Sequence, residues 1–285
     1  MSEQLENKIL LETYEQKRAA VANFNLMDDT FFSVVMSNNA ACEYLLTKLL
    51  GMPLKVIENK TQYSIRNIEN RSITLDVLAE DENGRLFNVE IQGANEYNHE
   101  YRIRYYRTAL DWSCLQKGAD YSKLPELYMI FISEFDPLKL NRVHYEIVQS
   151  VKGSGEPYSD GVHIHYFNTK IDDGSELAKL MQYLKKSDAG NTDFGALSQA
   201  VSYHKASNEG VEHMCRIMED YGEQKKNEGR IEGKIEGRIE GRIEGKIEGK
   251  IETIKNLLKN DISLDIALKC AELDRQTYER YADLQ

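Results

Sequence analysis

The sequence predicts an α/β fold in which a helix, three strands, a helix and a further strand follow one another, with a helical extension at the C-terminus. Two segments, 72–80 and 85–92, alternate apolar and polar residues as half-buried strands do. The segment 126–133 is almost wholly apolar, as expected of a strand that is buried on both faces. Helical spacing of apolar residues appears before residue 50 and again over 96–117.

The helices before the first strand are marked by their ends. Asp28 and Asp29 precede the apolar stretch 30–36, and an aspartate in this place is a helix-start signal. A second helix is expected to begin near Asn38 and to end at Gly51. The first part of the chain therefore begins with a helical layer.

The pattern is weaker after residue 135. Strands are expected at 144–151 and 162–168, separated by a loop rich in glycine, serine and proline at 152–161. Helices are expected at 175–187 and 193–223.

These patterns divide the chain into five segments. They are an N-terminal helix, a core, an extension of the core with mixed strands and helices, a repetitive helix or linker, and a short helical tail, at residues 1–27, 28–135, 136–223, 224–260 and 261–285.

The repetitive segment runs from Gly229 to Glu252 in units of glycine, a base, isoleucine and glutamate. Four residues turn a helix through about 400°, so a stripe of isoleucines drifts around it. Each glycine costs a helix about 1 kcal/mol relative to alanine. An isolated helix with this sequence should therefore be only marginally stable. The segment is then either a flexible linker or a helix that is stabilised by another copy of the chain. We favour a homo-oligomer formed through the repeat.

The hairpin over 73–92 is the most informative segment. A three-residue loop, 82–84, places Asp76 opposite Glu90 and needs a positive φ at its last position, which Gly84 supplies. This register also keeps one set of apolar residues on a single core-facing side, namely Ile73, Leu75, Val77, Ala79, Phe87, Val89 and Ile91. The opposite, solvent-facing side then carries the two acids together with Gln92.

Two adjacent carboxylates repel each other, and a divalent cation removes that repulsion. Mg²⁺, or Mn²⁺ in its place, takes one or two carboxylates and keeps several waters, which leaves room for a phosphate oxygen. A metal so placed activates its water and stabilises the charge on a phosphate that is being cleaved. The same spacing is also compatible with a solvated face that happens to be acidic.

Overall charge and composition limit the classes of function. The net charge of −11 argues against a protein that merely coats DNA, because such proteins are usually basic. An acidic protein can still act on DNA if metal ions and a local basic patch offset its charge. The alternative is that the protein does not contact nucleic acid.

The compartment is indicated by the apolar runs and the cysteines. No apolar run approaches the roughly 20 residues that span a bilayer, and the first residues are too polar for a signal peptide. The four cysteines are far apart and are expected to be packing residues rather than ligands or disulfide partners: Cys42, Cys114, Cys215 and Cys270. We expect a cytoplasmic protein without a membrane partner.

Four blocks within 28–135 resemble the Rpn family of recombination-promoting nucleases, also called PD-(D/E)XK nuclease family transposases. They are DDTFFSVVMSN, LTKLLG, ITLDVLAEDENGRLFNVEIQ and RIRYYRTALDWSCLQKGADYSKLPELYMIFI. The resemblance implies a restriction-endonuclease-like αβββαβ core and DNA as the substrate. The repeat and the tail also resemble the C-termini common in that family.

The resemblance also implies roles for particular residues. The family's catalytic aspartate matches Asp76, and its Glu-x-Gln pair matches Glu90 and Gln92. In the wider superfamily the last position is usually a lysine; glutamine can bind water but carries no charge, which affects the expected rate more than metal binding. An acid on the first helix often helps to hold metal, and Asp29 or Asp28 are candidates, although helix capping explains them equally well.

The helix after the hairpin offers a basic face. Arg102 and Tyr106 are four residues apart and share a side of that helix, with Arg104 nearby. These side chains are candidates for contacts with DNA phosphates, since arginine suits bidentate contacts. A solvated basic face with a tyrosine half in the core explains them equally well.

The sequence therefore predicts a Mg²⁺-dependent DNA endonuclease that hydrolyses phosphodiester bonds in recombination or transposition. Asp76 and Glu90 hold the metal, and Gln92 positions the attacking water. The alternative is a catalytically weak DNA-binding protein or an oligomeric scaffold with a nuclease-like core. The acidic net charge favours this alternative, and the hairpin favours the enzyme.

Overall fold

The computed structural model describes residues 15–66, 72–93 and 98–282, apart from some side chains in the long C-terminal helix. Residues 15–22 are helical, and the remainder of the predicted N-terminal helix before residue 15 lies outside the described residues.

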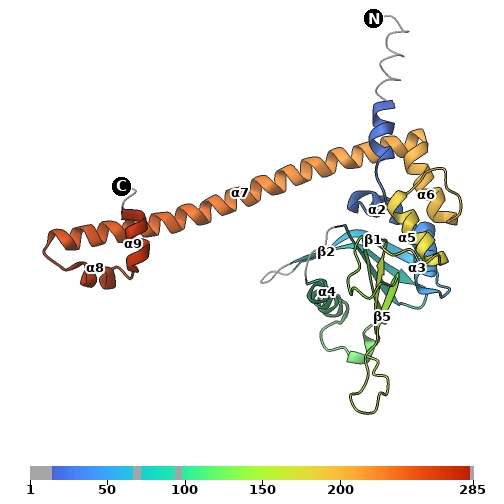
Figure 1. Cartoon of the computed structure of the whole chain (residues 1–285), viewed down its shortest axis with the longest axis horizontal. Coiled ribbons are helices and arrows are strands. Elements are labelled where there is room, and N and C mark those ends of the chain that lie inside the picture. Colours follow the sequence, from blue (N-terminus) through green and yellow to red (C-terminus); the bar gives the residue numbers. More distant parts are fainter. Residues whose placement is uncertain (1–14, 67–71, 94–97, 283–285) are drawn as a thin grey trace, which may run out of the picture. The chain divides into compact units, whose positions relative to one another are not determined.

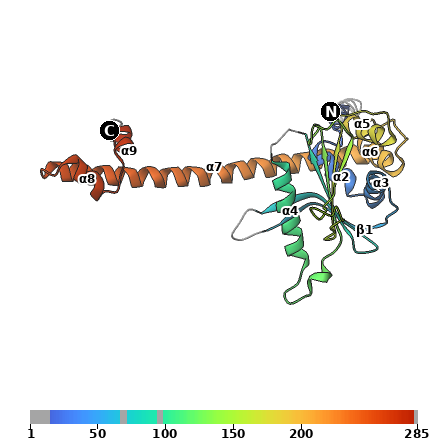
Figure 2. The same ribbon diagram turned by 60° about the horizontal axis from the view of Figure 1, so that its bottom comes forward.

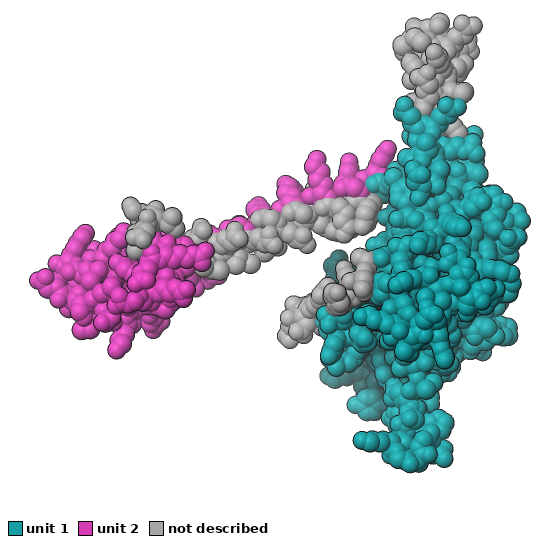
Figure 3. Space-filling view, viewed as in Figure 1, with its two compact units in different colours: residues 1–218 teal, residues 219–285 magenta. Residues whose placement is uncertain are grey.

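The chain forms two compact units (Figure 3). The first comprises Met1–Met218 and the second Glu219–Gln285.

The first unit is built on a six-stranded mixed sheet with the order β1-β2-β3-β4-β6-β5 (Figure 1). Its strands are β1 (Val56–Ile65), β2 (Ile73–Asp81), β3 (Leu86–Gln92), β4 (Leu127–Ser133), β5 (His144–Ile147) and β6 (Val162–Asn168). The strands β1, β2 and β3 are antiparallel neighbours, β4 lies parallel to both β3 and β6, and β5 is antiparallel to β6.

Helices cover both faces of this sheet (Figure 2). They are α2 (Asp29–Met36), α3 (Asn39–Leu50), α4 (His99–Cys114), α5 (Glu176–Lys186), α6 (Gly195–Ala206) and the start of α7 (Asn208–Lys259), with a short 3-10 helix, η1 (Tyr121–Lys123), before β4. One face packs against α4, and the other packs against α2, α3, α5 and α6. This arrangement confirms the predicted α/β fold and the predicted order of helix, three strands, helix and strand.

Each face of the sheet has its own apolar core. On the α4 side, Ile103 and Leu110 of the helix pack against Met129 and Phe131 of β4. On the other side, the alternate residues of β4, such as Ile130, pack against the remaining helices. The strand β4 is therefore buried on both faces, which explains its uninterrupted apolar sequence.

The β2–β3 hairpin has the register that the sequence predicts. Val77 pairs with Val89, and continuing this register sets Asp76 opposite Glu90. The loop spans 82–84, and Gly84 has a φ of 75° and donates its N–H to the Asp81 carbonyl at 2.9 Å.

The core-facing side of β2 changes at Asp76. Val77 and Ala79 pack on the side of α2 and α3, whereas Ile73 and Leu75 pack under α4. The prediction that all four share one side is wrong. The adjacent position on β1 is Gln62, whose φ of 50° breaks the regular alternation where it faces Asp76.

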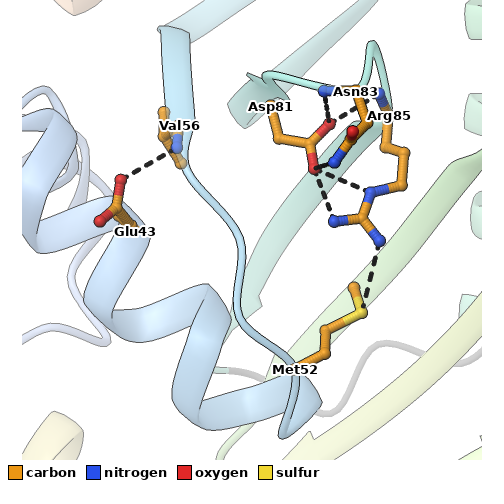
Figure 4. A network of polar contacts seen from close by, with 6 residues as sticks. All are labelled: Glu43, Met52, Val56, Asp81, Asn83 and Arg85. Carbon is orange, nitrogen blue, oxygen red and sulfur yellow. Dashed lines mark hydrogen bonds and ion pairs between the residues drawn. The ribbon is translucent and has the colours of Figure 1, made fainter.

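The hairpin loop is fixed by one buried carboxylate (Figure 4). Asp81 accepts hydrogen bonds from the backbone N–H groups of Asn83 and Arg85, at 3.0 and 2.9 Å, and from the Arg85 side chain. The Arg85 Nη2 lies 2.6 Å from Asp81 Oδ2. Burial acts to raise the pKa of Asp81, but these hydrogen bonds and the Arg85 charge outweigh burial and lower it.

The second unit consists of the remainder of α7 followed by α8 (Leu264–Cys270) and α9 (Arg275–Ala282). The repeat lies within α7, so its backbone is helical. A small core joins the end of α7 to α8 through Ile254, Ala267 and Leu268.

Two further expectations have a structural outcome. Cys42 and Cys215 are buried as packing residues, but Cys114 and Cys270 are exposed, so the prediction that all four cysteines pack is wrong for these two. Among the described residues, no helix is long and apolar enough to cross a membrane.

Candidate active site

The predicted acids meet where the β2–β3 ladder opens. The ladder pairs extend as far as Val77 and Val89, immediately before the acidic pair. There the Ile91 N–H donates to Asp76 Oδ2 at 2.9 Å, and the Asp76 N–H donates to Glu90 Oε1 at 3.3 Å. Each carboxylate therefore accepts a backbone hydrogen bond from the hairpin, and this exchange holds the two acids side by side.

Both acids are buried, which corrects the expectation that they face solvent. Asp76 is 8% exposed and Glu90 is 3% exposed. Arg102, Ile103 and Tyr106 of α4 lie beside Glu90, so the helix covers this part of the hairpin. Their surroundings are nevertheless polar, because both acids accept backbone hydrogen bonds and Arg102 lies beside Glu90.

Burial and the negative charge of neighbouring acids raise the pKa values of the acid pair. Burial, with a smaller contribution from the charge of Asp29, raises the pKa of Asp76 to about 6 against the hydrogen bond from the Ile91 N–H. Burial and the charge of Asp76 raise the pKa of Glu90 well above its usual range, although Arg102 acts to lower it. Burial disfavours the ionised form of both carboxyl groups, and a cation bound between them would favour that form.

Arg102 reaches the acids from α4 instead of pointing towards solvent. Its Nη1 donates to Gln92 Oε1 at 2.7 Å, and its Nη2 lies 3.4 Å from Glu90 Oε2. The structure therefore brings together four of the predicted residues in one place: Asp76, Glu90, Gln92 and Arg102.

Two other predicted residues differ in position. Tyr106 is half-buried one turn after Arg102, whose guanidinium lies 5.2 Å from the centre of its ring. Arg104 lies on the exposed side of α4, where its guanidinium stacks 5.3 Å from the Tyr101 ring. The site thus includes Tyr106, whereas Arg104 belongs to a different face of the helix.

The two acids at the start of α2 are distinguished by the structure. Asp28 occupies the N-cap position but accepts from the Asn25 N–H at 2.7 Å and does not cap the helix. Asp29, the first residue of α2, acts electrostatically on Asp76. Asp29 is therefore the better candidate for a third acid at the site.

Two nearby residues were not identified from the sequence. Gln62 of β1 donates from Nε2 to Ser33 Oγ at 3.0 Å, and its side chain acts to lower the pKa of Asp76. Asn88 is fully buried two residues before Glu90, and its Nδ2 and Oδ1 have no hydrogen-bond partner among the described residues. For Asn88, the only signal in the sequence is its spacing of two residues from Glu90, which places both side chains on the same face of β3. No feature of the sequence distinguishes Gln62 from its neighbours.

The donor set fits a hard divalent cation. Carboxylate oxygens are the ligands that Mg²⁺ prefers, and one or two of them suffice when waters complete its coordination. The pKa values of Asp76 and Glu90 are raised mainly by burial, and a bound cation would lower them by favouring the ionised carboxylates. Within the described part of the chain, no three histidine, cysteine, aspartate or glutamate side chains form a ready metal cluster.

A mixed sheet covered by helices on both faces, with an acid pair at the opening of its central hairpin, is consistent with a PD-(D/E)XK nuclease fold. The family model of the PD-(D/E)XK nuclease family transposases matches residues 29–226, which is more than half of the chain. The chain belongs to this family. No curated protein and no solved structure matches it.

Proposed function

We propose that the chain is a DNA endonuclease that hydrolyses phosphodiester bonds with a divalent metal ion. The observation that carries this proposal is the buried pair of Asp76 and Glu90 at the opening of the β2–β3 ladder. Membership of the family implies a DNA substrate and a nuclease associated with transposition.

In this proposal Asp76 and Glu90 hold Mg²⁺ or Mn²⁺, and Asp29 adds negative charge to the same place. When bound, the metal supplies an activated water and charge neutralisation at the phosphate. Asp76 Oδ2 and Glu90 Oε1 are each oriented by a backbone N–H, so the carboxylates are positioned before the ion arrives.

Gln92 and Arg102 then act together on the water and the phosphate. Because Gln92 Oε1 accepts from Arg102, its amide N–H groups are directed away from the guanidinium and can donate to a water or a phosphate oxygen. Arg102 supplies the positive charge that a lysine at position 92 would otherwise carry. The chain keeps that charge at the site although it has glutamine at this position.

Nicking of a supercoiled plasmid tests the function. Wild-type protein is expected to nick only with Mg²⁺ or Mn²⁺ present, and Asp76→Asn should reduce the rate by roughly two orders of magnitude or more. Asparagine can still accept the Ile91 N–H, so the hairpin should remain intact. Glu80→Gln, on the same strand, is the matched control and should nick normally. Equal nicking by Asp76→Asn would remove the assignment.

Metal binding has a separate readout in calorimetry. Mn²⁺ should bind wild-type protein and bind Asp76→Asn much more weakly, whether or not DNA is cleaved. The alternative of a DNA-binding protein with a weak nuclease core predicts a DNA shift on a gel without cleavage under any divalent metal. The alternative of an oligomeric scaffold predicts no affinity for DNA.

We also propose that copies of the chain associate through the repeat in α7. Support comes from the glycines, since a methyl group added at Gly237, Gly241 or Gly245 would have no atom within 4 Å apart from the backbone of its own helix. These glycines leave room for a partner helix to approach closely.

A further inference from the structure

The outer side of α4 carries a row of exposed aromatic rings. Tyr101, Tyr105 and Trp112 are separated by four and seven residues, so they share one side of the helix together with Thr108. Their exposed fractions are 62%, 38% and 71%. Large aromatic surface left in water along one helix indicates an interaction site and not a packing face.

This outer row is distinct from the side of α4 that serves the site. Ile103 and Leu110 are buried beneath the helix, and Arg102 and Tyr106 lie at the acid pair. The residues of the outer row contribute to neither the core nor the acid pair.

Exposed basic residues lie beside the row in an otherwise acidic chain. Residues 99–123 contain five basic and three acidic residues, whereas the whole chain has a net charge of −11. Arg102 of this set lies at the acid pair, and Arg107 is paired with both Asp111 and Asp160. The exposed positive charge beside the row therefore comes from Arg104, which lies against Tyr101. Exposed Lys117 continues the positive charge beyond the helix.

We propose that the outer side of α4 binds single-stranded DNA, with bases stacked on Tyr101, Tyr105 and Trp112 and phosphates held by Arg104. Rings interleaved with cations are the features with which proteins bind unpaired strands, because every base offers a flat face. The proposal deepens the proposed nuclease function and rests on it for the choice of DNA. It places an unpaired strand on the same helix that holds Arg102 at the acids.

The composition of the row favours nucleic acid over a second copy of the chain. The exposed residues of α4 are aromatic, charged, small or polar, with Glu100 as the one acid among them, and none of them is leucine, isoleucine, valine or methionine. Rings without aliphatic neighbours offer stacking surfaces but little of the apolar core that a protein partner would bury.

Trp112 is the only tryptophan in the chain, so its fluorescence reports directly on this surface. Oligothymidylate titrated into the full chain in EDTA should quench that fluorescence with saturation. A duplex of the same length should quench it much less, because its bases are already stacked. Equal quenching by the duplex, or tighter binding of oligouridylate, would overturn the assignment to single-stranded DNA.

Variants identify the residues through the anisotropy of a labelled oligothymidylate. Trp112→Ala and Tyr101→Ala should each weaken binding about tenfold, whereas Trp112→Phe should retain it. Tyr158→Ala, which removes an exposed tyrosine outside α4, is the matched control and should bind normally. Equal affinity of all four variants would overturn the proposal. A change in Trp112 fluorescence that depends on protein concentration and not on the oligonucleotide would also overturn it, because it would indicate that a second copy of the chain covers this surface.

The test separates this proposal from the nuclease proposal. Binding is measured without metal and also in Asp76→Asn, where cleavage is expected to be lost. Quenching without nicking in wild-type protein would leave the α4 surface standing and remove the endonuclease. Nicking without quenching would do the reverse.

Discussion

At the scale of single residues, Arg102 changes the interpretation of the site most. The sequence indicated a phosphate contact on a basic helix face, whereas the structure turns the guanidinium onto Gln92 and Glu90. Its charge offsets part of the repulsion between the acids and lies beside the position at which related nucleases carry lysine. The glutamine of the Glu-x-Gln pair is thereby coupled to a cation from another element.

A first prediction follows from this coupling. Arg102→Gln should lower the plasmid-nicking rate by roughly two orders of magnitude, because the site loses its fixed positive charge. Adding Gln92→Lys to that variant should restore part of the rate, since the lysine returns a charge to the same place. Rates are measured at saturating Mg²⁺ to separate this effect from metal affinity. If the double variant is as slow as Arg102→Gln alone, a positive charge at position 92 cannot replace the charge of Arg102, and the prediction is contradicted.

The acid pair itself could be predicted from the sequence, because register in a hairpin follows from loop length and from the position of Gly84. The partner of Gln92 could not be predicted in this way. It depends on how α4 packs across the sheet, which no local pattern specifies. The burial of Asp76 has the same origin, since it follows from the cover that α4 provides and from the irregular backbone at Gln62.

At the scale of elements, the β2–β3 hairpin positions both acids, and the Asp81–Arg85 pair holds its loop (Figure 4). Asp81 is fully buried and satisfies two backbone N–H groups of the loop as well as the guanidinium. Loss of this carboxylate would leave buried donors without a partner and would loosen the register that brings Asp76 to Glu90.

Asp81→Asn is therefore expected to lower the free energy of unfolding by about 2 kcal/mol at neutral pH, measured by denaturant titration. The folded pKa of Asp81 is lowered, so its stabilisation is fully present above the unfolded value of about 4 and is lost as the pH falls through the folded pKa. The difference between wild type and variant should shrink in acid. A difference that stays constant down to pH 2 would show that the charge of Asp81 is not the cause.

Arg85→Lys gives a further check on the same element. Lysine keeps a positive charge but cannot make the forked contact of the guanidinium with Asp81, so stability at neutral pH should fall by about 1 kcal/mol. The loss should be smaller than that of Asp81→Asn, because the backbone hydrogen bonds to Asp81 remain. A loss as large as that of Asp81→Asn would mean that the loop depends on the guanidinium more than on the carboxylate.

At the scale of the whole molecule, the chain joins a compact α/β unit to a long helix. The glycine-rich sequence of that helix disfavours helix formation by a single isolated chain. The structure describes α7 as helical through the repeat, although each glycine costs about 1 kcal/mol relative to alanine. Sequence patterns indicated the repeat and its length but not its continuity with the helix that begins at Asn208. Val211 and Met214 pack the start of α7 into the first unit, and this long-range contact is not visible in a four-residue period.

The glycines of the repeat therefore decide between a self-associating helix and a linker. A double substitution, Gly237→Ala and Gly241→Ala, should raise the helical signal in circular dichroism because alanine favours the helix and its methyl group has no atom within 4 Å apart from the backbone of its own helix. If copies associate through the repeat, the added methyl groups should also weaken association, and sedimentation should shift towards the monomer. Gly222→Ala, on the same helix before the repeat, is the matched control and should leave the mass unchanged. A rise in helical signal with no change in mass would identify α7 as a helical spacer and remove the proposal that copies associate there.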